Sequence, residues 1–304
     1  MTERRKILLV GLDQAGKTSI LNILHNKYTM MDNIKPTAGI ERDEIQILGI
    51  PILCWDLGGQ LKFREGYIKD VKIFAETDSL FYVVDALNPD RYEESLQYYT
   101  DILENFKKLD LKTKVVLCIH KIDPNIRNNP HTLEIIDHVK QIFEARSSGL
   151  EVTTFITSIY DRKSIVDAFS KNFQELIVTL KPFRKLLESL RSQLNLDGLI
   201  LFDNQLYILS EAYRNHEMEE TCLNMTYNSV YYMSQTNPQM ADKSANFAKN
   251  FEFILNLRNK EKRFNFMEVK FKEWEIFLLT VSDEKLDTGA IQSKFNSMVA
   301  QIEI

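Results

Sequence analysis

The sequence predicts an α/β fold followed by an α+β fold: a mostly parallel sheet flanked by helices, then a domain with an antiparallel sheet. Two observations predict it. Apolar runs alternate with amphipathic helical stretches up to about residue 180, which is typical of a parallel sheet covered on both faces. Near Pro182 the pattern changes to a helix followed by paired apolar runs. We therefore predict a first domain at residues 1–181 and a second domain at residues 182–304.

The first domain contains apolar runs of strand length, with amphipathic stretches of helix length between them. In a parallel sheet of this kind a ligand lies at the carboxyl ends of the strands. The predicted strands are Ile7–Val10, Ile50–Trp55, Ser79–Val84, Val115–Ile119 and Thr153–Ile156, and the predicted helices include Glu93–Leu109 and Leu133–Ala145.

A glycine loop directly follows the first predicted strand. Residues 11–18 read Gly-Leu-Asp-Gln-Ala-Gly-Lys-Thr, which is the G-x-x-x-x-G-K-T spacing of a phosphate-binding loop. Gly11 and Gly16 allow successive backbone N–H groups to point at an anion, and the following helix adds its dipole. Lys17 is expected to contact the β and γ phosphates, and the Thr18 hydroxyl to bind Mg²⁺. The residues expected to contact the nucleotide here are Asp13, Gln14, Ala15, Gly16, Lys17, Thr18 and Ser19.

Two further loops are expected to respond to the γ-phosphate. Asp56 ends the second predicted strand and can hold Mg²⁺ through a water. Gly59 can donate a backbone N–H to the γ-phosphate, and Gln60 can orient the attacking water, which makes Gln60 the candidate catalytic residue. Thr37, in Lys-Pro-Thr-Ala-Gly, can complete the Mg²⁺ shell when the γ-phosphate is present. Both loops would order around a triphosphate and relax on hydrolysis. The expected metal ligands are Thr18, Thr37 and Asp56.

The sequence His-Lys-Ile-Asp at residues 120–123 follows the fourth predicted strand. The Asp123 carboxylate can accept hydrogen bonds from guanine N1–H and from the 2-amino group, whereas adenine offers neither donor there. The motif therefore favours GTP and GDP over adenine nucleotides. His120 is expected to lie between the base and phosphate loops, and the stem of Lys121 to cover the base. Backbone N–H groups of Ser158 and Ile159 are expected to close the base pocket.

These motifs, in this order, resemble the Ras-superfamily GTPases and, within them, the Rag/Gtr family. The phosphate loop and the Trp-Asp-Leu-Gly-Gly-Gln segment at 55–60 also resemble Arf GTPases. Two features favour Rag/Gtr: His120 stands where most small GTPases have asparagine, and Thr-Ser-Ile-Tyr-Asp at 157–161 is similar to the Rag pattern. The resemblance implies a P-loop GTPase domain that uses GTP, GDP and Mg²⁺.

The resemblance also implies that hydrolysis is slow. Asp13 stands where glycine is common, at a position where bulk slows hydrolysis. We expect an intrinsic rate on the order of 10⁻⁴ s⁻¹ or below until an activating protein binds. One subgroup of the family lacks the glutamine, so Gln60 implies the hydrolysis-competent type of subunit. Arg64 is expected to be a mobile switch residue rather than an internal arginine finger.

The second half has a pattern of helix, hairpin, helix, strand pair and helix, which resembles the roadblock/longin-like domain of Rag/Gtr proteins. Asp203-Asn204 is expected to be a two-residue turn between paired strands, and residues 213–240 match no element. Trp274–Leu279 is apolar on both faces, which favours a strand buried between helices over one at a dimer interface. The predicted elements are a helix around Leu186–Leu194, strands Gly198–Phe202 and Gln205–Leu209, a helix Asp242–Arg258, strands Phe264–Phe271 and Trp274–Val281, and a helix Leu286–Gln301.

The resemblance implies partners. The C-terminal domain would pair with a paralogous Rag/Gtr-like GTPase or with a second copy of this chain. The resemblance implies three further kinds of partner: GTPase-activating proteins, exchange proteins and a roadblock-type membrane scaffold. The implied function is to relay amino-acid sufficiency to the TOR kinase complex. The protein would be cytoplasmic and held peripherally on endolysosomal or other membranes.

Composition narrows the function classes. The net charge of −5 argues against a protein that binds nucleic acid mainly through phosphates. The three cysteines are far apart in sequence, which favours free thiols in a reducing compartment. Position 2 is threonine, and Gln301–Ile304 contains no cysteine, so neither N-myristoylation nor prenylation is expected. We expect no direct membrane anchor.

Two other functions remain open at this point. One is a scaffold that is stabilised by a bound nucleotide but hardly turns it over. The other is an Arf-like trafficking GTPase with an added dimerisation domain.

Overall fold

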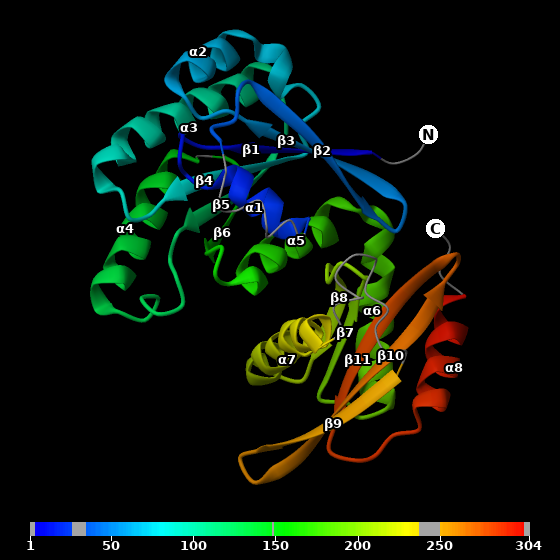
Figure 1. Cartoon of the computed structure of the whole chain (residues 1–304). Coiled ribbons are helices and arrows are strands. Elements are labelled where there is room, and N and C mark those ends of the chain that lie inside the picture. Colours follow the sequence, from blue (N-terminus) through cyan, green and yellow to red (C-terminus); the bar gives the residue numbers. More distant parts are fainter. Residues whose placement is uncertain (1–3, 26–34, 148, 237–249, 301–304) are drawn as a thin grey trace. The chain divides into compact units, whose positions relative to one another are not determined.

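The computed structural model describes residues 4–25, 35–147, 149–236 and 250–300 (Figure 1). The chain forms two compact units, Met1–Ala168 and Phe169–Ile304. Their division lies inside a helix, N-terminal to residue 181, and the domain boundary at 181/182 stays a prediction. The predicted fold class, a mostly parallel α/β sheet followed by an antiparallel α+β sheet, is confirmed.

The first unit is built on a six-stranded sheet with the order β2-β3-β1-β4-β5-β6. Five strands are parallel because helices connect them, and only the β2–β3 pair is antiparallel. The strands are β1 (Arg5–Val10), β2 (Ile40–Ile47), β3 (Ile50–Leu57), β4 (Ser79–Asp85), β5 (Lys114–His120) and β6 (Val152–Thr157). Every predicted strand of this half is confirmed.

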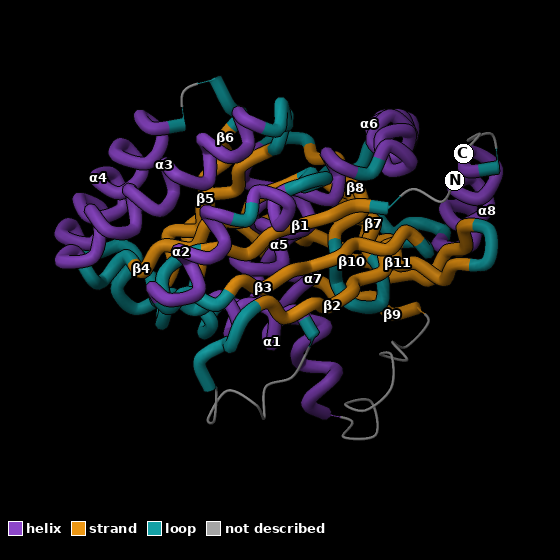
Figure 2. Tube along the Cα trace, turned by 90° about the horizontal axis from the view of Figure 1, so that it is seen from above, coloured by secondary structure: helices purple, strands orange, loops and turns teal. Residues whose placement is uncertain are grey.

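Helices cover both faces of this sheet; Figure 2 shows the helices and strands from above. On one face Leu8 and Val10 of β1 pack in a core with side chains from α3 and α4. Because alternate residues of a strand point to opposite faces, Ile7 and Leu9 are fully buried on the other face. The helices are α1 (Lys17–Leu24), α2 (Leu61–Lys69), α3 (Tyr92–Lys108), α4 (Pro130–Arg146) and α5 (Arg162–Leu176), with single 3₁₀ turns at Val71–Phe74 and Pro89–Arg91.

Strand β2 was not among the predicted strands. Its sequence is Ile-Glu-Arg-Asp-Glu-Ile-Gln-Ile, and only Ile45 and Ile47 are buried. An edge strand has one neighbour and needs few apolar side chains, so its period-2 pattern is weak. This strand is determined by its pairing with β3 along its whole length. The register runs from Ile40 opposite Leu57 to Ile47 opposite Ile50.

The second unit is built on a five-stranded antiparallel sheet with the order β8-β7-β11-β10-β9. Helix α7 packs against β7 and β11, while α6 and α8 pack against each other and against β8 and β10. The elements are α6 (Lys181–Gln193), β7 (Gly198–Phe202), β8 (Ile208–Tyr213), α7 (His216–Thr236), β9 (Asn250–Leu257), β10 (Lys260–Phe271), β11 (Trp274–Ser282) and α8 (Thr288–Val299), with a 3₁₀ turn at Val178–Leu180.

The central strand β11 carries the apolar segment 276–281, which is buried throughout. Of the segment 274–279, interpreted from the sequence as a strand buried between helices, residues 276–279 are buried, whereas Trp274 is half-buried and Glu275 is exposed. The predicted two-residue turn at Asp203-Asn204 is wrong, because β7 ends at Phe202 and β8 begins at Ile208. Asp203 Oδ1 instead accepts hydrogen bonds from the N–H groups of Gln205 and Tyr207, both at 2.9 Å.

The helix predicted at 242–258 is also wrong where the structure describes it. Residues 250–257 form β9, and residues 242–249 lie outside the described part. Phe251 stacks on Phe266 of β10 at 4.4 Å between ring centroids, and Phe253 stacks on Phe264 at 4.9 Å. Phenylalanines two residues apart fit a strand. The turn Arg258-Asn259, with φ of 50° and 64°, has the two left-handed residues that a two-residue hairpin needs.

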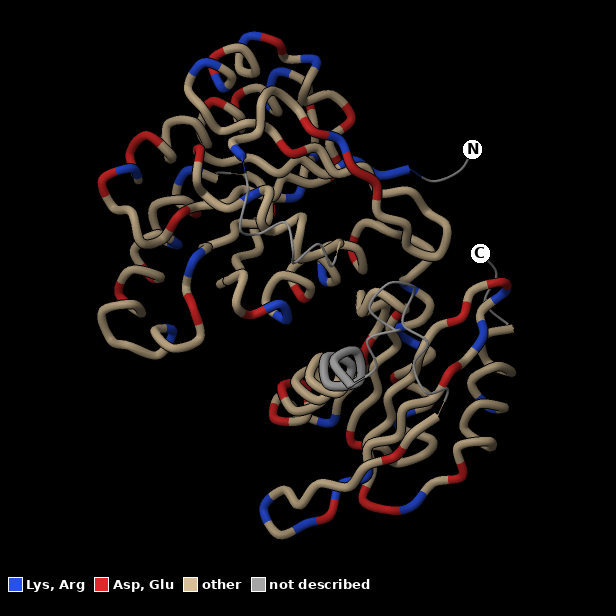
Figure 3. The backbone as a smooth tube through the Cα atoms, in the orientation of Figure 1, with Lys and Arg blue, Asp and Glu red and all other residues tan. Residues whose placement is uncertain are grey.

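Residues 216–236, which no sequence pattern assigned, form α7. Charged residues of both signs occur along the backbone of both units (Figure 3). Within the described part of the chain, no helix has the length and hydropathy of a membrane span.

Candidate functional site

A cavity of about 540 Å³ lies at the carboxyl ends of the parallel strands of the first unit. Most of the residues that the sequence predicts for the site line this cavity, although they come from five separate loops. They are Asp13, Gln14, Gly16, Lys17, Thr18, Ser19, Thr37, Gly59, Gln60, His120, Lys121, Asp123 and Ile159. Ala15, Asp56 and Ser158 do not line the cavity; each is buried beside it.

The phosphate loop joins β1 to α1. Gly16 has φ of 101°, and a Cβ there would lie 2.5 Å from the ring of His120, so only glycine fits this position. Lys17 is 5% exposed, and its Nζ donates to the carbonyls of Gly11 at 3.2 Å and Leu12 at 3.0 Å. Burial lowers the pKa of Lys17, and the Asp56 carboxylate opposes that effect. A buried cation whose hydrogen-bond acceptors among the described residues are neutral carbonyls is well suited to bind a polyphosphate.

Three oxygen side chains meet beside this lysine. Thr18 Oγ1 donates to Asp56 Oδ2 at 2.5 Å, and it lies 2.8 Å from Thr37 Oγ1. Thr37 Oγ1 also donates to Asp56 Oδ2, at 3.2 Å. The other carboxylate oxygen of Asp56 is buried and has no hydrogen-bond partner among the described residues. Two hydroxyls and a buried carboxylate are hard oxygen donors of the kind that Mg²⁺ prefers, so these residues fit that ion.

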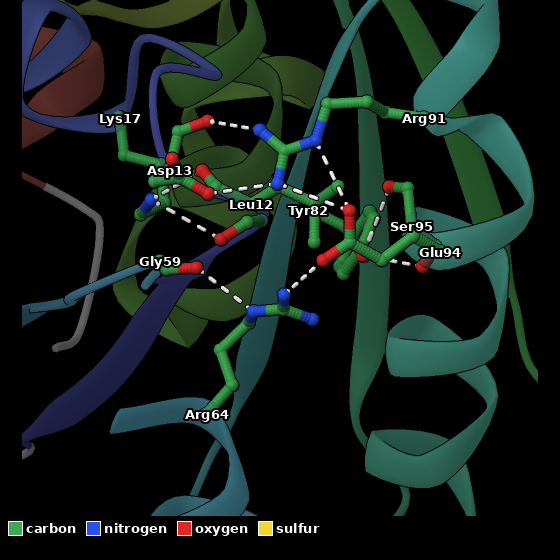
Figure 4. Close-up of polar contacts among 10 residues, drawn as sticks. Leu12, Asp13, Lys17, Gly59, Arg64, Tyr82, Arg91, Glu94 and Ser95 are labelled. Atoms are coloured by element: carbon green, nitrogen blue, oxygen red, sulfur yellow. Dashed lines mark hydrogen bonds and ion pairs between the residues drawn. The ribbon is translucent and has the colours of Figure 1, made fainter. Parts of the chain in front are cut away.

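Gln60 lies in the short loop after β3, behind Gly58 and Gly59, and is the N-cap residue of α2. Arg64, which the sequence predicts to be a mobile switch residue, is buried and paired in this structure: its side chain is 6% exposed. Its Nε donates to the Gly59 carbonyl at 2.8 Å, and its guanidinium pairs with Glu94 of α3 (Figure 4). The backbone next to Gln60 is therefore tied to α3 in this structure.

The base loop follows β5. His120 Nδ1 lies 2.9 Å from Thr157 Oγ1, and its ring lies against Gly16, so His120 does lie between the two loops. Burial lowers the pKa of His120 to about 4. Lys121 Nζ donates to Asp85 Oδ2 at 2.8 Å.

Ser158 is placed differently from the expectation. Its backbone N–H donates to Ser164 Oγ at 3.2 Å and is therefore not aimed at a base. Its hydroxyl donates to Asp123 Oδ1 at 2.5 Å. Ser158 thus orients the carboxylate that is expected to read guanine, and Ile159 lines the cavity itself.

Sequence reasoning missed four lining residues: Lys35 and Pro36, which lie just before Thr37, and two residues of other loops, Leu87 and Tyr160. Leu87 and Tyr160 are exposed apolar side chains, at 49% and 76%, in loops after β4 and β6. The rule that ligands lie at the carboxyl ends of parallel strands, applied to exposed apolar residues as well as polar ones, would have found them.

The neutral buried His120 predicts a pH effect on stability. In the unfolded chain the pKa of this histidine is about 6.5, whereas in the folded protein it is about 4. Between these values the unfolded state binds more protons, so the free energy of unfolding falls as pH is lowered through this window. We expect His120 to account for about 2 kcal/mol of the loss between pH 7 and pH 5.

Urea unfolding of the wild type and of His120→Asn at both pH values measures this effect. The variant should lose that much less stability on acidification. His131→Asn is the matched control, because that imidazole is 80% exposed on α4. An equal pH dependence in wild type and His120→Asn would contradict the buried neutral histidine.

Comparison with known proteins identifies the family. The model of the Gtr1/RagA G protein conserved region matches residues 6–233. The Ras-related GTP-binding protein A of Dictyostelium discoideum is 28% identical over 211 residues, covering 68% of this chain and 69% of that protein. The GTP-binding protein GTR1 of Saccharomyces cerevisiae is 24% identical over 264 residues, covering 82% and 80%.

The human Ras-related GTP-binding protein C is 29% identical over 221 residues, and the match spans 69% of this chain and about half, 54%, of that protein. Among solved structures, the Arl6 BBS3 small GTPase of Trypanosoma brucei with bound GppNp is 17% identical and covers 57% of this chain and 97% of its own, with a TM-score of 0.46.

The family model covers about three quarters of the chain, and the resemblance that the sequence predicted is confirmed. A G protein binds GTP or GDP together with Mg²⁺ and hydrolyses GTP. The chain belongs to the Gtr1/RagA family of G proteins and is a GTPase of the Ras superfamily.

Proposed function

We propose that this GTPase is a molecular switch whose slow hydrolysis resets it. The observation that carries the proposal is the meeting of Thr18, Thr37 and Asp56 within 3.2 Å of one another beside Lys17. Thr37 comes from the segment before β2, outside the P-loop. A metal ion held by all three side chains would couple this segment to the bound nucleotide.

Each remaining residue has a role that follows from its position. Lys17 and the P-loop amides hold the phosphates, and Mg²⁺ neutralises their charge when bound. Asp123, oriented by Ser158, reads guanine, while the Lys121 stem, Leu87 and Tyr160 border the same cavity. Gln60 is the candidate to orient water at the other end of the cavity.

We further infer that the protein acts as a dimer, with a paralogous Rag/Gtr-like GTPase or with itself, through the domain proposed at 182–304. Family membership supports this, because the relatives include Ras-related GTP-binding proteins A, B, C and D. On the same ground we propose that activating and exchange proteins regulate it, and that a roadblock-type scaffold holds it peripherally at a membrane, where it signals nutrient state to the TOR kinase complex. Light-scattering chromatography of the chain alone and with candidate paralogues tests the assembly.

The reset step is tested by single-turnover hydrolysis of bound GTP. We expect a wild-type rate on the order of 10⁻⁴ s⁻¹, and a rate at least about tenfold lower in Gln60→Leu, because the leucine cannot orient water. GDP retention should be the same in both. Gln97→Leu, at an exposed glutamine of α3, is the matched control. Equal rates in wild type and Gln60→Leu would favour the low-turnover scaffold instead of a switch.

A further inference from the structure

Four charged side chains from three separate segments form a continuous chain of ion pairs (Figure 4). Arg91, which ends a 3₁₀ turn, donates from Nη2 to Asp13 Oδ1 at 2.8 Å and from Nη1 to the Asp13 carbonyl at 3.2 Å. Its Nε donates to Glu94 Oε2 at 3.1 Å, and the other oxygen of Glu94 pairs with Arg64. We call Asp13, Arg91, Glu94 and Arg64 the charge chain.

The charge chain is more than a set of surface ion pairs, which typically contribute little. The Arg64 guanidinium is nearly excluded from water and lies 5.1 Å from the ring centroid of Tyr98. A buried guanidinium that lost Glu94 would be left without its counter-charge, which is costly. The charge chain holds two acids and two arginines, so its formal charge sums to zero, and the loss of any single member leaves a net charge.

The two ends of the charge chain touch the functional site. Asp13 lines the cavity together with Lys17. Its position is next to Gly59, since a Cβ on Gly59 would lie 2.2 Å from the Asp13 nitrogen. Asp13 therefore lies at the end of the cavity where the γ-phosphate is proposed. A free carboxylate there would repel a phosphate.

Arg91 removes that repulsion. Burial alone would raise the pKa of Asp13, yet the hydrogen bond and the charge of Arg91 hold the pKa below its usual value. The carboxylate is thus ionised and at the same time neutralised by the guanidinium. At the other end, Arg64 Nε holds the carbonyl of Gly59 at 2.8 Å, which belongs to the peptide bond that leads to Gln60.

We propose that the charge chain couples the P-loop to the Gly59–Gln60 peptide, with Arg91 shielding the phosphate site from Asp13 and Arg64 fixing the backbone at Gln60. Arg91, Glu94 and Arg64 are then positioning residues for this GTPase. The inference rests on the proposed function, because it assigns the cavity to a guanine nucleotide. It carries a specific consequence: loss of Arg91 weakens GTP binding more than GDP binding, since a triphosphate places additional charge near Asp13.

Dissociation rates of fluorescent GDP and of a fluorescent, non-hydrolysable GTP analogue test the shielding. In Arg91→Gln we expect the GTP analogue to dissociate about tenfold faster and GDP less than about threefold faster. In Asp13→Asn/Arg91→Gln the repelling charge is absent, so the rate for the GTP analogue should return to within about threefold of Asp13→Asn alone. Equal acceleration for both nucleotides, or no rescue by Asp13→Asn, would overturn the shielding role.

Arg5→Gln is the matched control, because Arg5 forms an ion pair of 3.0 Å and similar exposure with Asp78. That pair lies at the amino end of β1, opposite to the P-loop. The Arg5→Gln variant should leave the dissociation rates of GDP and of the GTP analogue unchanged.

The coupling to Gln60 is tested with Glu94→Gln. The N–H groups of Phe63 and Arg64 donate to the Gln60 carbonyl in the first turn of α2, so their hydrogen exchange reports the position of that turn. We expect their exchange to become about tenfold faster and hydrolysis about tenfold slower, with GDP dissociation unchanged. Unchanged exchange at these amides would refute the coupling.

Two outcomes distinguish a failure of the proposed function from a failure of the charge-chain role. A wild-type protein that retains no guanine nucleotide would refute the proposed function and this inference with it. A wild-type protein that retains guanine nucleotides, while Arg91→Gln behaves like Arg5→Gln, would refute only the role of the charge chain.

Discussion

Lys17→Ala is expected to lower the affinity for both GTP and GDP by at least about a thousandfold. In the structure the ammonium is buried and has the carbonyls of Gly11 and Leu12 as hydrogen-bond acceptors. A bound polyphosphate would add negative charge directly against the ammonium. Removing one member of a desolvated charge pair costs several kcal/mol because the other is left unpaired, and about 4 kcal/mol corresponds to a thousandfold.

Equilibrium titration with fluorescent GDP and GTP analogues measures this effect. Lys140→Ala is a suitable control, since Lys140 is half exposed on α4 and pairs only loosely, at 4.0 Å, with Glu144. The same thermal stability of all three proteins without nucleotide would show that the loss lies in binding and not in folding. Tight nucleotide retention by Lys17→Ala would contradict the assignment of the cavity.

Gly59→Ala is expected to reduce hydrolysis by about a hundredfold while GDP affinity changes by less than about threefold. An added Cβ would lie 2.2 Å from both the Asp13 nitrogen and the Leu12 carbonyl carbon. These are backbone atoms of the P-loop, so the loop that carries Gly59 after β3 has to move instead. Gln60 follows directly and moves with it, and a displacement of about 1 Å at a reacting centre can cost a hundredfold in rate.

Single-turnover hydrolysis and GDP titration, run side by side, separate these effects. Gly66→Ala provides the matched control: Gly66 lies inside α2, and a Cβ there meets no atom within 4 Å. Alanine at that helical position should stabilise the protein by about 0.5–1 kcal/mol and leave the rate unchanged. A wild-type hydrolysis rate in Gly59→Ala would show that the contact between Gly59 and the P-loop is not needed for the reaction.

Much of the fold could be predicted because its central strands are buried on both faces. Such strands are nearly continuous apolar runs, as in β4, where residues 79–84 are all buried. The two strands that escaped prediction, β2 and β9, are edge strands. At an edge, the neighbouring strand and the turn determine the conformation more than the segment's own composition does.

The candidate site likewise has a part that the sequence could predict and a part that it could not. Gly16, Lys17 and Thr18 are close in sequence, so their local geometry follows from the spacing of the loop. The hydroxyl of Ser158, in contrast, meets Asp123 across 35 residues. Whether Ser158 presents its N–H or its hydroxyl to the site depends on Ser164, which no local motif encodes.

By itself the sequence determined the fold class and the family, and it picked out the glycine loop and Asp123 as parts of the candidate site, where both line the cavity. Each depends on residues that are adjacent in the chain, or on strands whose continuous apolar sequence predicts that they are buried. Only the tertiary structure decided that Arg64 is held in place and that Asp13 is neutralised by Arg91, 78 residues away. The physical reason is that an ion pair between distant residues depends on how strands and helices pack, and isolated charges in a sequence do not specify their partners.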